Sequence, residues 1–222
     1  MQITSRPSPN FGPRRDGLTP TLIVLHYTAM PDPAKALDRL CAPEHEVSAH
    51  YFLHRDGRVF QLVDEDMRAW HAGAGTWGGM DDINSRSIGI EMDNDGASPF
   101  SEPQMSTLET VLPEIMQRWN IAPEGIIGHS DMAPGRKADP GPRFDWARLA
   151  RQGLVARSGR SEPIDDLAIE TFRSCAAKLG YPTDIDDTAL LTAVRLRHRP
   201  WGNGPLSKED FAALPDVSHF LV

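Results

Sequence analysis

The stretch Gly128-His129-Ser130-Asp131-Met132-Ala133-Pro134-Gly135-Arg136-Lys137-Ala138-Asp139-Pro140-Gly141-Pro142 brings an imidazole, a cation and a carboxylate into one short segment. His129 follows the apolar pair Ile126-Ile127, which predicts that it lies at the exit of a buried strand. The prolines and glycines after it argue against a helix and indicate fixed loop conformations. Lys137 and Asp139 are two residues apart, so in an extended segment their side chains point the same way.

A metal site can be assembled from this segment and one other strand end. A histidine and a carboxylate that converge with a second histidine give zinc three protein ligands and leave a fourth position for water. We predict the second histidine at His26, which ends the apolar run Leu22-Ile23-Val24-Leu25. One such histidine alone is more often a packed residue, and Lys137 with Asp139 alone would suit a surface ion pair. Their combination favours the metal site.

Composition restricts the class of protein. The chain has 222 residues and a formal net charge of −8, which suits one α/β domain with a small appendage and predicts no nucleic-acid partner. Cys41 and Cys175 lie outside any CxxC pattern, which favours a reducing compartment or buried thiols and leaves a disulfide open. The first ten residues do not resemble a signal peptide, and no run reaches the ~18 apolar residues of a membrane span. We therefore expect a cytoplasmic protein without a membrane anchor.

The hydrophobic pattern predicts an α/β fold built from short strands and helices. Apolar runs predict strands at 21–27, 47–53, 59–63, 87–92 and 125–128. Apolar residues at helical spacing predict helices at 34–41, 101–119 and 145–152. Asp56-Gly57 indicates a hairpin, and Ser101 and Pro103 indicate an N-cap and a first helical turn. Pro113 is expected to kink the long helix or to end its first half.

These patterns divide the chain into four parts. Residues 1–20 are rich in Pro, Arg and Gly and are predicted to form an extended N-terminal arm, and residues 21–152 form the main α/β domain. Residues 153–163 are polar and indicate a linker. Residues 164–222 carry three short helical patterns. About sixty residues are marginal as a free domain, so we expect a three-helix lobe that docks on the main domain and adds no catalytic group.

The segment Trp70–Gly79 is rich in glycine and carries two tryptophans, which predicts a loop. Large aromatic side chains in a loop beside a cleft are candidates for a substrate wall. The alternative is that the rings of Trp70 and Trp77 cover the edge of the core, and the two interpretations are about equally supported by the pattern.

The residues around the predicted metal site suit the hydrolysis of an amide. Ser87–Met92 is predicted as a strand that delivers Glu91, which would accept a proton from water and return it to a leaving amine. Lys137 is placed to stabilise negative charge on the carbonyl oxygen under attack. A solvated acid at a strand end is the alternative interpretation of Glu91.

The chain resembles the zinc-dependent N-acetylmuramoyl-L-alanine amidases of the type-2 amidase family, which are related to the peptidoglycan recognition proteins. The matching motifs, in family order over roughly residues 5–152, are Val24–Thr28, Val47–Tyr51, Arg68–Gly73, Asn84 with Ser87–Glu91, and His129–Trp146. The resemblance implies a mixed central β-sheet flanked by helices, with zinc on His26, His129 and Asp139. It also implies Glu91 and Lys137 as the catalytic pair.

The reaction that the resemblance implies is hydrolysis of the amide between the lactyl group of N-acetylmuramic acid and L-alanine of the stem peptide. The partners implied are muropeptides and other peptidoglycan fragments. The C-terminal helices resemble a peptidoglycan-binding three-helix domain, through Lys178-Leu179-Gly180-Tyr181 and the helix spacing. The substrate-binding residues that we predict in or beside the motifs are Trp70, His71, Trp77, Asn84 and His50.

Three positions depart from related branches of the family. Ala49 stands where phage-type members carry a tyrosine, which favours the version of the mechanism that uses Glu91. Glu46 and Asp82 stand where the cytosolic amidases of muropeptide recycling carry arginines, and the body of the chain is more similar to the branch with outer-membrane lipoprotein amidases. We therefore expect cleavage of both 1,6-anhydro and ordinary soluble muropeptides in cell-wall recycling.

Two other functions are compatible with parts of the pattern. A muropeptide recognition module without catalysis would normally lack a zinc ligand, and here all three candidates are present. A purely structural zinc is normally closed by four protein ligands, which disfavours it here.

Overall fold

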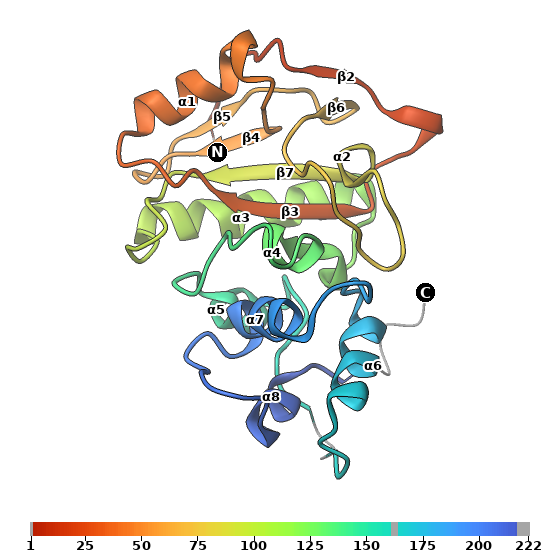
Figure 1. Cartoon of the computed structure of the whole chain (residues 1–222). Helices are drawn as coiled ribbons and strands as arrows, with labels where there is room; N and C mark the ends of the chain where they lie inside the picture. Colours follow the sequence, from red (N-terminus) through yellow and green to blue (C-terminus); the bar gives the residue numbers. More distant parts are fainter. Residues whose placement is uncertain (1, 161–163, 217–222) are drawn as a thin grey trace.

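The computed structural model describes residues 2–160 and 164–216, and a mixed six-stranded β-sheet forms its centre (Figure 1). The strands lie in the order β1-β5-β4-β7-β3-β8 across the sheet. Their bounds are β1 Ile3–Ser5, β3 Leu22–Tyr27, β4 Tyr51–Leu53, β5 Val59–Gln61, β7 Ser87–Met92 and β8 Ile126–Gly128. A second sheet pairs β2 (Phe11–Pro13) with β6 (Met67–Ala69). The predicted α/β fold with a mixed central sheet is confirmed.

The central strands are parallel, so their carboxyl ends meet at one edge of the sheet. β3 pairs in parallel with β7 on one side and with β8 on the other. His26 lies opposite Glu91 in the first pairing, and Leu25 lies opposite Gly128 in the second. His129 therefore follows directly after the paired segment of β8. In open α/β sheets, ligands bind outside the carboxyl ends of the strands, and this is where these residues lie.

Helices cover both faces of the sheet. Their bounds are α1 Pro33–Cys41, α2 Ile83–Arg86, α3 Glu102–Trp119, α4 His129–Met132, α5 Trp146–Arg151, α6 Ile169–Leu179, α7 Asp187–His198 and α8 Lys208–Ala213. On the face behind the sheet in Figure 1, Leu25 and Ile90 share a hydrophobic cluster with Leu112 of α3. Because side chains alternate along a strand, His26 and Glu91 point to the opposite face.

Two groups of helices pack on that opposite face. Helix α1 covers β4, where Leu37 and Phe52 belong to one buried cluster. Helices α6, α7 and α8 cover β3 and β8, where Phe172 belongs to one cluster with Val24 and Ile127. Figure 1 shows α1 above the sheet and α6–α8 below it, with the ends of β7 and β3 between them. The face that carries His26 is therefore enclosed from both sides.

The C-terminal helices share a core with the sheet. Gly180 ends α6 with a positive φ of 112°, and a Cβ atom there would lie 2.6 Å from the ring of Trp77. Glycine thus allows the lobe to pack closely on the main domain. Within residues 164–216 the structure has three helices, α6, α7 and α8. The division into arm, domain, linker and lobe stays a prediction.

Local structure differs from expectation in two places outside the site. Residues Ile3–Ser5 of the N-terminal arm form a strand, which pairs in parallel with β5 at the edge of the main sheet. Helix α3 continues through Pro113 to Trp119, so the proline does not end its first half. Ser101 caps this helix through the backbone N–H of Gln104 at 3.3 Å, as predicted.

The expectation of no helix after Gly128 is wrong. His129–Met132 forms one turn, α4. The first proline of the segment is Pro134, so no backbone N–H within the turn is missing. The carboxylate of Asp131 accepts the N–H of Gly128 at 2.8 Å and caps the turn.

Cys41 and Cys175 are free thiols, so they do not form the disulfide that the sequence left open. Among the helices of residues 2–160 and 164–216, none has the length and apolar character needed to cross a membrane.

Candidate metal centre and its pocket

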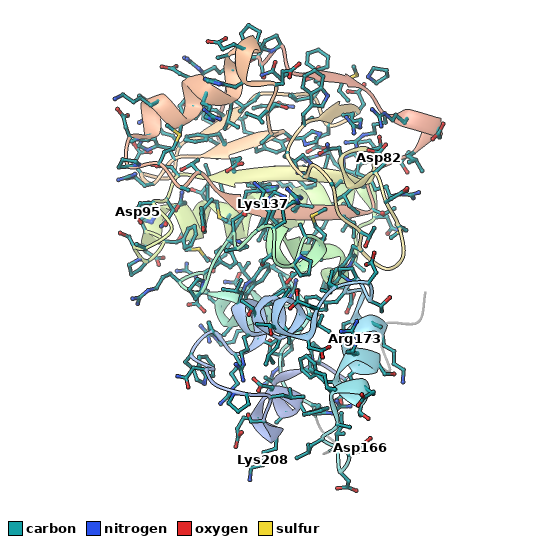
Figure 2. The ribbon with its side chains drawn as sticks, viewed as in Figure 1. Asp82, Asp95, Lys137, Asp166, Arg173 and Lys208 are labelled. Atoms are coloured by element: carbon teal, nitrogen blue, oxygen red, sulfur yellow. The ribbon has the colours of Figure 1, made fainter. Side chains whose placement is uncertain are left out.

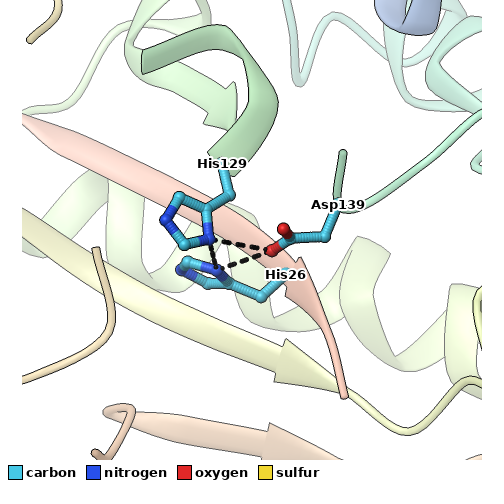
Figure 3. Close-up of side chains that lie close together, drawn as sticks. All are labelled: His26, His129 and Asp139. Atoms are coloured by element: carbon cyan, nitrogen blue, oxygen red, sulfur yellow. Dashed lines mark hydrogen bonds and ion pairs between the residues drawn. The ribbon is translucent and has the colours of Figure 1, made fainter. Parts of the chain in front are cut away.

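The three side chains that the sequence predicts as metal ligands converge at the carboxyl end of β3 (Figure 3). His26 Nδ1 lies 2.9 Å from His129 Nδ1 and 2.9 Å from Asp139 Oδ2, and His129 Nδ1 lies 3.0 Å from the same oxygen. All three side chains are buried. A strand, a helix start and a loop thus bring three ligand atoms to one point.

The hydrogen bonds around these atoms favour a bound cation. His129 Nε2 lies 2.8 Å from the carbonyl oxygen of Ala72. A carbonyl only accepts, so Nε2 carries the proton and Nδ1 of the neutral ring is a lone pair directed at the Asp139 carboxylate. If both rings instead donated from Nδ1 to this carboxylate, two N–H groups would face each other at 2.9 Å. A metal ion can be coordinated by all three atoms at once, so the residues present fit a metal site.

Burial keeps His26 neutral, as a metal ligand must be. Burial, followed by the nearby His129, lowers the pKa of His26 to about 4. His71 lies behind it, with Nδ1 3.0 Å from His26 Nε2. Burial and then His26 lower the pKa of His71 well below its ordinary value. Its other nitrogen lies 3.2 Å from Ser87 Oγ, so His71 is held on both sides and orients the His26 ring.

Gly89 of β7 makes the position of His71 possible. A Cβ atom at Gly89 would lie 2.4 Å from the His71 ring. The glycine within the strand pattern Ser87–Met92 was the sequence signal for this close approach, but the sequence did not show which group approaches.

A pocket of about 410 Å³ opens beside the cluster, between α1 and the loop after α4. Its lining includes His26, His129 and Asp139, with Glu91 and Lys137 next to them. Glu91 extends from β7 beside His26, and its Oε2 is enclosed without a hydrogen-bond partner among the described residues. Burial, followed by the charge of Asp139, raises the pKa of Glu91 to about 8, while Lys137 opposes the shift. A carboxyl with such a pKa can exchange a proton near neutral pH.

Lys137 reaches the pocket from the loop after α4. Its backbone N–H donates to the Ala133 carbonyl at 3.0 Å, which fixes where the loop leaves the turn. The side chain is exposed, and Figure 2 shows it over the middle of β7 and β3. Within the described part of the chain its ammonium makes no ion pair, so its charge is available to a ligand in the pocket.

The five predicted substrate-binding residues divide into two groups. Trp70 and His71 line the pocket. Trp77, Asn84 and His50 are buried and do not line it, and their contact with substrate stays a prediction. The ring of Trp77 instead packs edge-on against the ring of Tyr181, with 5.1 Å between centroids.

Asn84 and His50 support the site from within the fold. Asn84 Oδ1 accepts the backbone N–H groups of His71 at 3.0 Å and Ala72 at 2.8 Å, so it fixes the loop whose carbonyl bonds His129. His50 Nδ1 accepts the N–H of Gly89 at 2.9 Å. Polar residues in family motifs can be either contacts or supports, and the sequence does not separate the two.

Comparison with known proteins identifies one family of amidases. A profile of the family described as N-acetylmuramoyl-L-alanine amidase (Amidase_2) matches residues 16–142. The chain is 38% identical to the N-acetylmuramoyl-L-alanine amidase AmiD of Escherichia coli over 151 residues, which is 61% of this chain and 54% of that protein. It is 36% identical over 160 residues to the 1,6-anhydro-N-acetylmuramyl-L-alanine amidase AmpD of Enterobacter cloacae, or 64% of this chain and 86% of that one. The match to AmiD thus spans about half of that relative.

Solved structures resemble nearly the whole chain. The complex of E. coli AmiD with anhydro-N-acetylmuramic acid-L-Ala-D-gamma-Glu-L-Lys has a TM-score of 0.79 at 30% identity, covering 94% of this chain and 90% of that one. AmpDh3 of Pseudomonas aeruginosa in complex with anhydromuramic pentapeptide has a TM-score of 0.74 at 30% identity, covering 94% of both chains.

Proposed function

The chain belongs to the N-acetylmuramoyl-L-alanine amidase family, and from this membership we propose that its pocket hydrolyses the amide between the lactyl group of N-acetylmuramic acid and L-alanine of the stem peptide. We further propose zinc as the metal, with His26, His129 and Asp139 as ligands. The observation that carries the proposal is the convergence of these three ligand atoms within 4.8 Å of one another, beside the carboxyl of Glu91. Two histidines and one carboxylate form a usual ligand set of catalytic zinc.

A zinc ion held by His26, His129 and Asp139 would polarise a carbonyl and lower the pKa of a bound water molecule. The chain's own residues move the protons. Glu91 accepts a proton from the attacking water and then gives it to the amide nitrogen. Lys137 offers a positive charge to the carbonyl oxygen while the carbon is tetrahedral.

Atoms and protons balance in this scheme. The water oxygen forms a bond to the lactyl carbonyl carbon, and the carbon–nitrogen bond breaks. The proton that Glu91 took from water leaves with the amine of L-alanine. The second proton of the water leaves the new carboxyl group and protonates the amine. The products are therefore a muramyl carboxylate and a stem peptide with an ammonium group, and Glu91 returns to its ionised starting form.

Zinc content and product analysis test the proposal together. Purified chain is expected to carry one zinc and to release free stem peptide from a muropeptide, as followed by mass spectrometry. Zinc without peptide release would favour a recognition module or a structural metal. A chain that binds the muropeptide without metal would contradict the proposed site.

Lys137→Ala is expected to lower kcat about 100-fold, the scale of one lost group that stabilises an oxyanion. Its zinc content should not change, because the ammonium is not a ligand. Lys35→Ala is the matched control, since Lys35 is an exposed lysine of α1 outside the pocket. Steady-state kinetics on one muropeptide compare the three chains, and equal kcat values would remove Lys137 from the mechanism.

The substrates that we propose are small soluble muropeptides, of both the 1,6-anhydro and the ordinary type. Neither Glu46 nor Asp82 lines the pocket, and Asp82 is paired with Arg68 at 2.8 Å, away from Lys137 (Figure 2). The acids at these two positions therefore do not contact a ligand in the pocket. An acidic chain also has no general attraction to anionic wall polymers.

We expect kcat/KM for matched anhydro and ordinary muropeptides to differ by less than about 1,000-fold, which corresponds to about 4 kcal/mol of transition-state discrimination. Insoluble sacculi, tested under the same conditions, should be the poorest substrate. A strong preference for sacculi would contradict action on soluble fragments. The cytoplasmic location stays a prediction, which fractionation of cells that produce the full-length protein would check.

A further inference from the structure

A buried carboxylate connects the candidate metal centre to the C-terminal lobe. Asp131 lies two residues after His129 in α4, and its side chain is fully buried. Its Oδ2 accepts the backbone N–H of Gly128 at 2.8 Å, which caps the turn from which the His129 ring extends. The same turn also fixes the backbone of the ligand Asp139, because the N–H of Ser130 donates to the Asp139 carbonyl at 2.9 Å.

Two residues of the lobe donate the remaining hydrogen bonds to this carboxylate. Arg197 Nη1 of α7 donates to Asp131 Oδ2 at 2.6 Å. Tyr181, in the connection between α6 and α7, donates its hydroxyl to Oδ1 at 2.9 Å. Both side chains are buried. A buried carboxylate is stable only with its charge paired and its oxygens hydrogen-bonded, so the orientation of Asp131 depends on the lobe.

Arg197 is itself fixed to the main domain. Its Nη2 donates to the carbonyl of Ile126, in β8, at 3.0 Å. The guanidinium lies 4.3 Å from the centre of the Trp146 ring. Three contacts in different directions leave the side chain one arrangement, in which it joins β8, α4 and α5.

We propose that Arg197 and Tyr181 are positioning residues for the metal centre, which act through Asp131 to hold His129 and Asp139 at the spacing that binds zinc. This inference rests on the proposed function. Neither residue lines the pocket, so their effect on the metal passes through α4. Partners that orient metal ligands change metal affinity about 10- to 100-fold when they are removed.

Helix α7 also provides a matched control. Arg195 lies two residues before Arg197 and forms a comparable ion pair, with Nη2 2.7 Å from Asp210 Oδ2. Asp210 belongs to α8, so this pair stabilises the lobe internally and does not contact α4. Loss of either arginine removes one buried ion pair, but only loss of Arg197 frees Asp131.

The experiment uses the full-length, zinc-loaded chain and measures the rate of zinc release to a chromophoric chelator together with the thermal midpoint. Arg197→Met and Tyr181→Phe are expected to release zinc at least ten times faster than wild type. Arg195→Met is expected to lower the thermal midpoint but to release zinc at the wild-type rate. Tyr181→Phe removes one hydroxyl and keeps the ring against Trp77, so it carries the test if Arg197→Met does not fold.

The outcomes separate this inference from the proposed function. If the wild type binds no zinc, both are wrong. If the wild type binds zinc and all three variants release it at the wild-type rate, only the positioning role is wrong. If Arg195→Met accelerates release as much as Arg197→Met, the lobe acts through stability alone and the route through Asp131 is rejected.

Discussion

A His129→Ala chain is expected to lose its zinc and its amidase activity together. The substitution leaves two protein ligands, and it removes the one whose ring is fixed by the Ala72 carbonyl at 2.8 Å. Catalysis that depends on polarisation by the metal should then fall to the level of a blank reaction. The measurement is metal analysis after gel filtration, with peptide release assayed on the same sample.

His54→Ala is the control for this substitution. His54 lies at the hairpin turn, paired with Asp56, and does not line the pocket. It is expected to keep zinc and activity. Undiminished zinc in His129→Ala would show that the ligand assignment is wrong, whatever the activity.

Much of the main fold could be predicted from local patterns. The apolar run before His26 predicts a buried strand, and the structure has it as β3 with Leu22 to Leu25 buried. The Asp56-Gly57 signal predicts the hairpin, and β4 pairs antiparallel with β5. These predictions succeed because burial of both faces of a strand and the conformation of a tight turn depend on a few neighbouring residues.

The sequence predicts which residues of the candidate site lie at the ends of strands, but it does not predict how those strand ends are arranged. Glu91 and His26 each end an apolar strand, so the sequence indicates that they lie at a sheet edge. Their side-by-side position follows from the parallel register of β3 and β7, which no local pattern specifies. The one-turn helix at His129 was missed because the carboxylate that caps it, Asp131, lies three residues after the end of the strand, Gly128. The other partners of this carboxylate come from the lobe.

The loop that carries the two tryptophans shows why the direction of individual side chains could not be predicted. Trp70 faces the pocket and Trp77 faces the lobe, although both lie in the same glycine-rich segment. The difference arises from Gly180, more than a hundred residues later, which leaves room for the Trp77 ring. Contacts of this range are absent from the sequence pattern, so the alternative that the ring covers the core applies to Trp77.

Glu91→Gln is expected to lower kcat about 1,000-fold, within the 10²- to 10⁴-fold range of general acid–base catalysis. The amide matches the carboxyl in shape but cannot carry a proton from water to the leaving amine. Zinc content should be unchanged, since Glu91 is not among the ligands. The thermal midpoint should not fall, because Glu91 Oε2 has no hydrogen-bond partner among the described residues that the amide would lose. Glu44→Gln, an exposed glutamate outside the pocket, is the control. Near-normal turnover of Glu91→Gln with full zinc would exclude Glu91 as the base and leave the proton transfer to another group of the pocket.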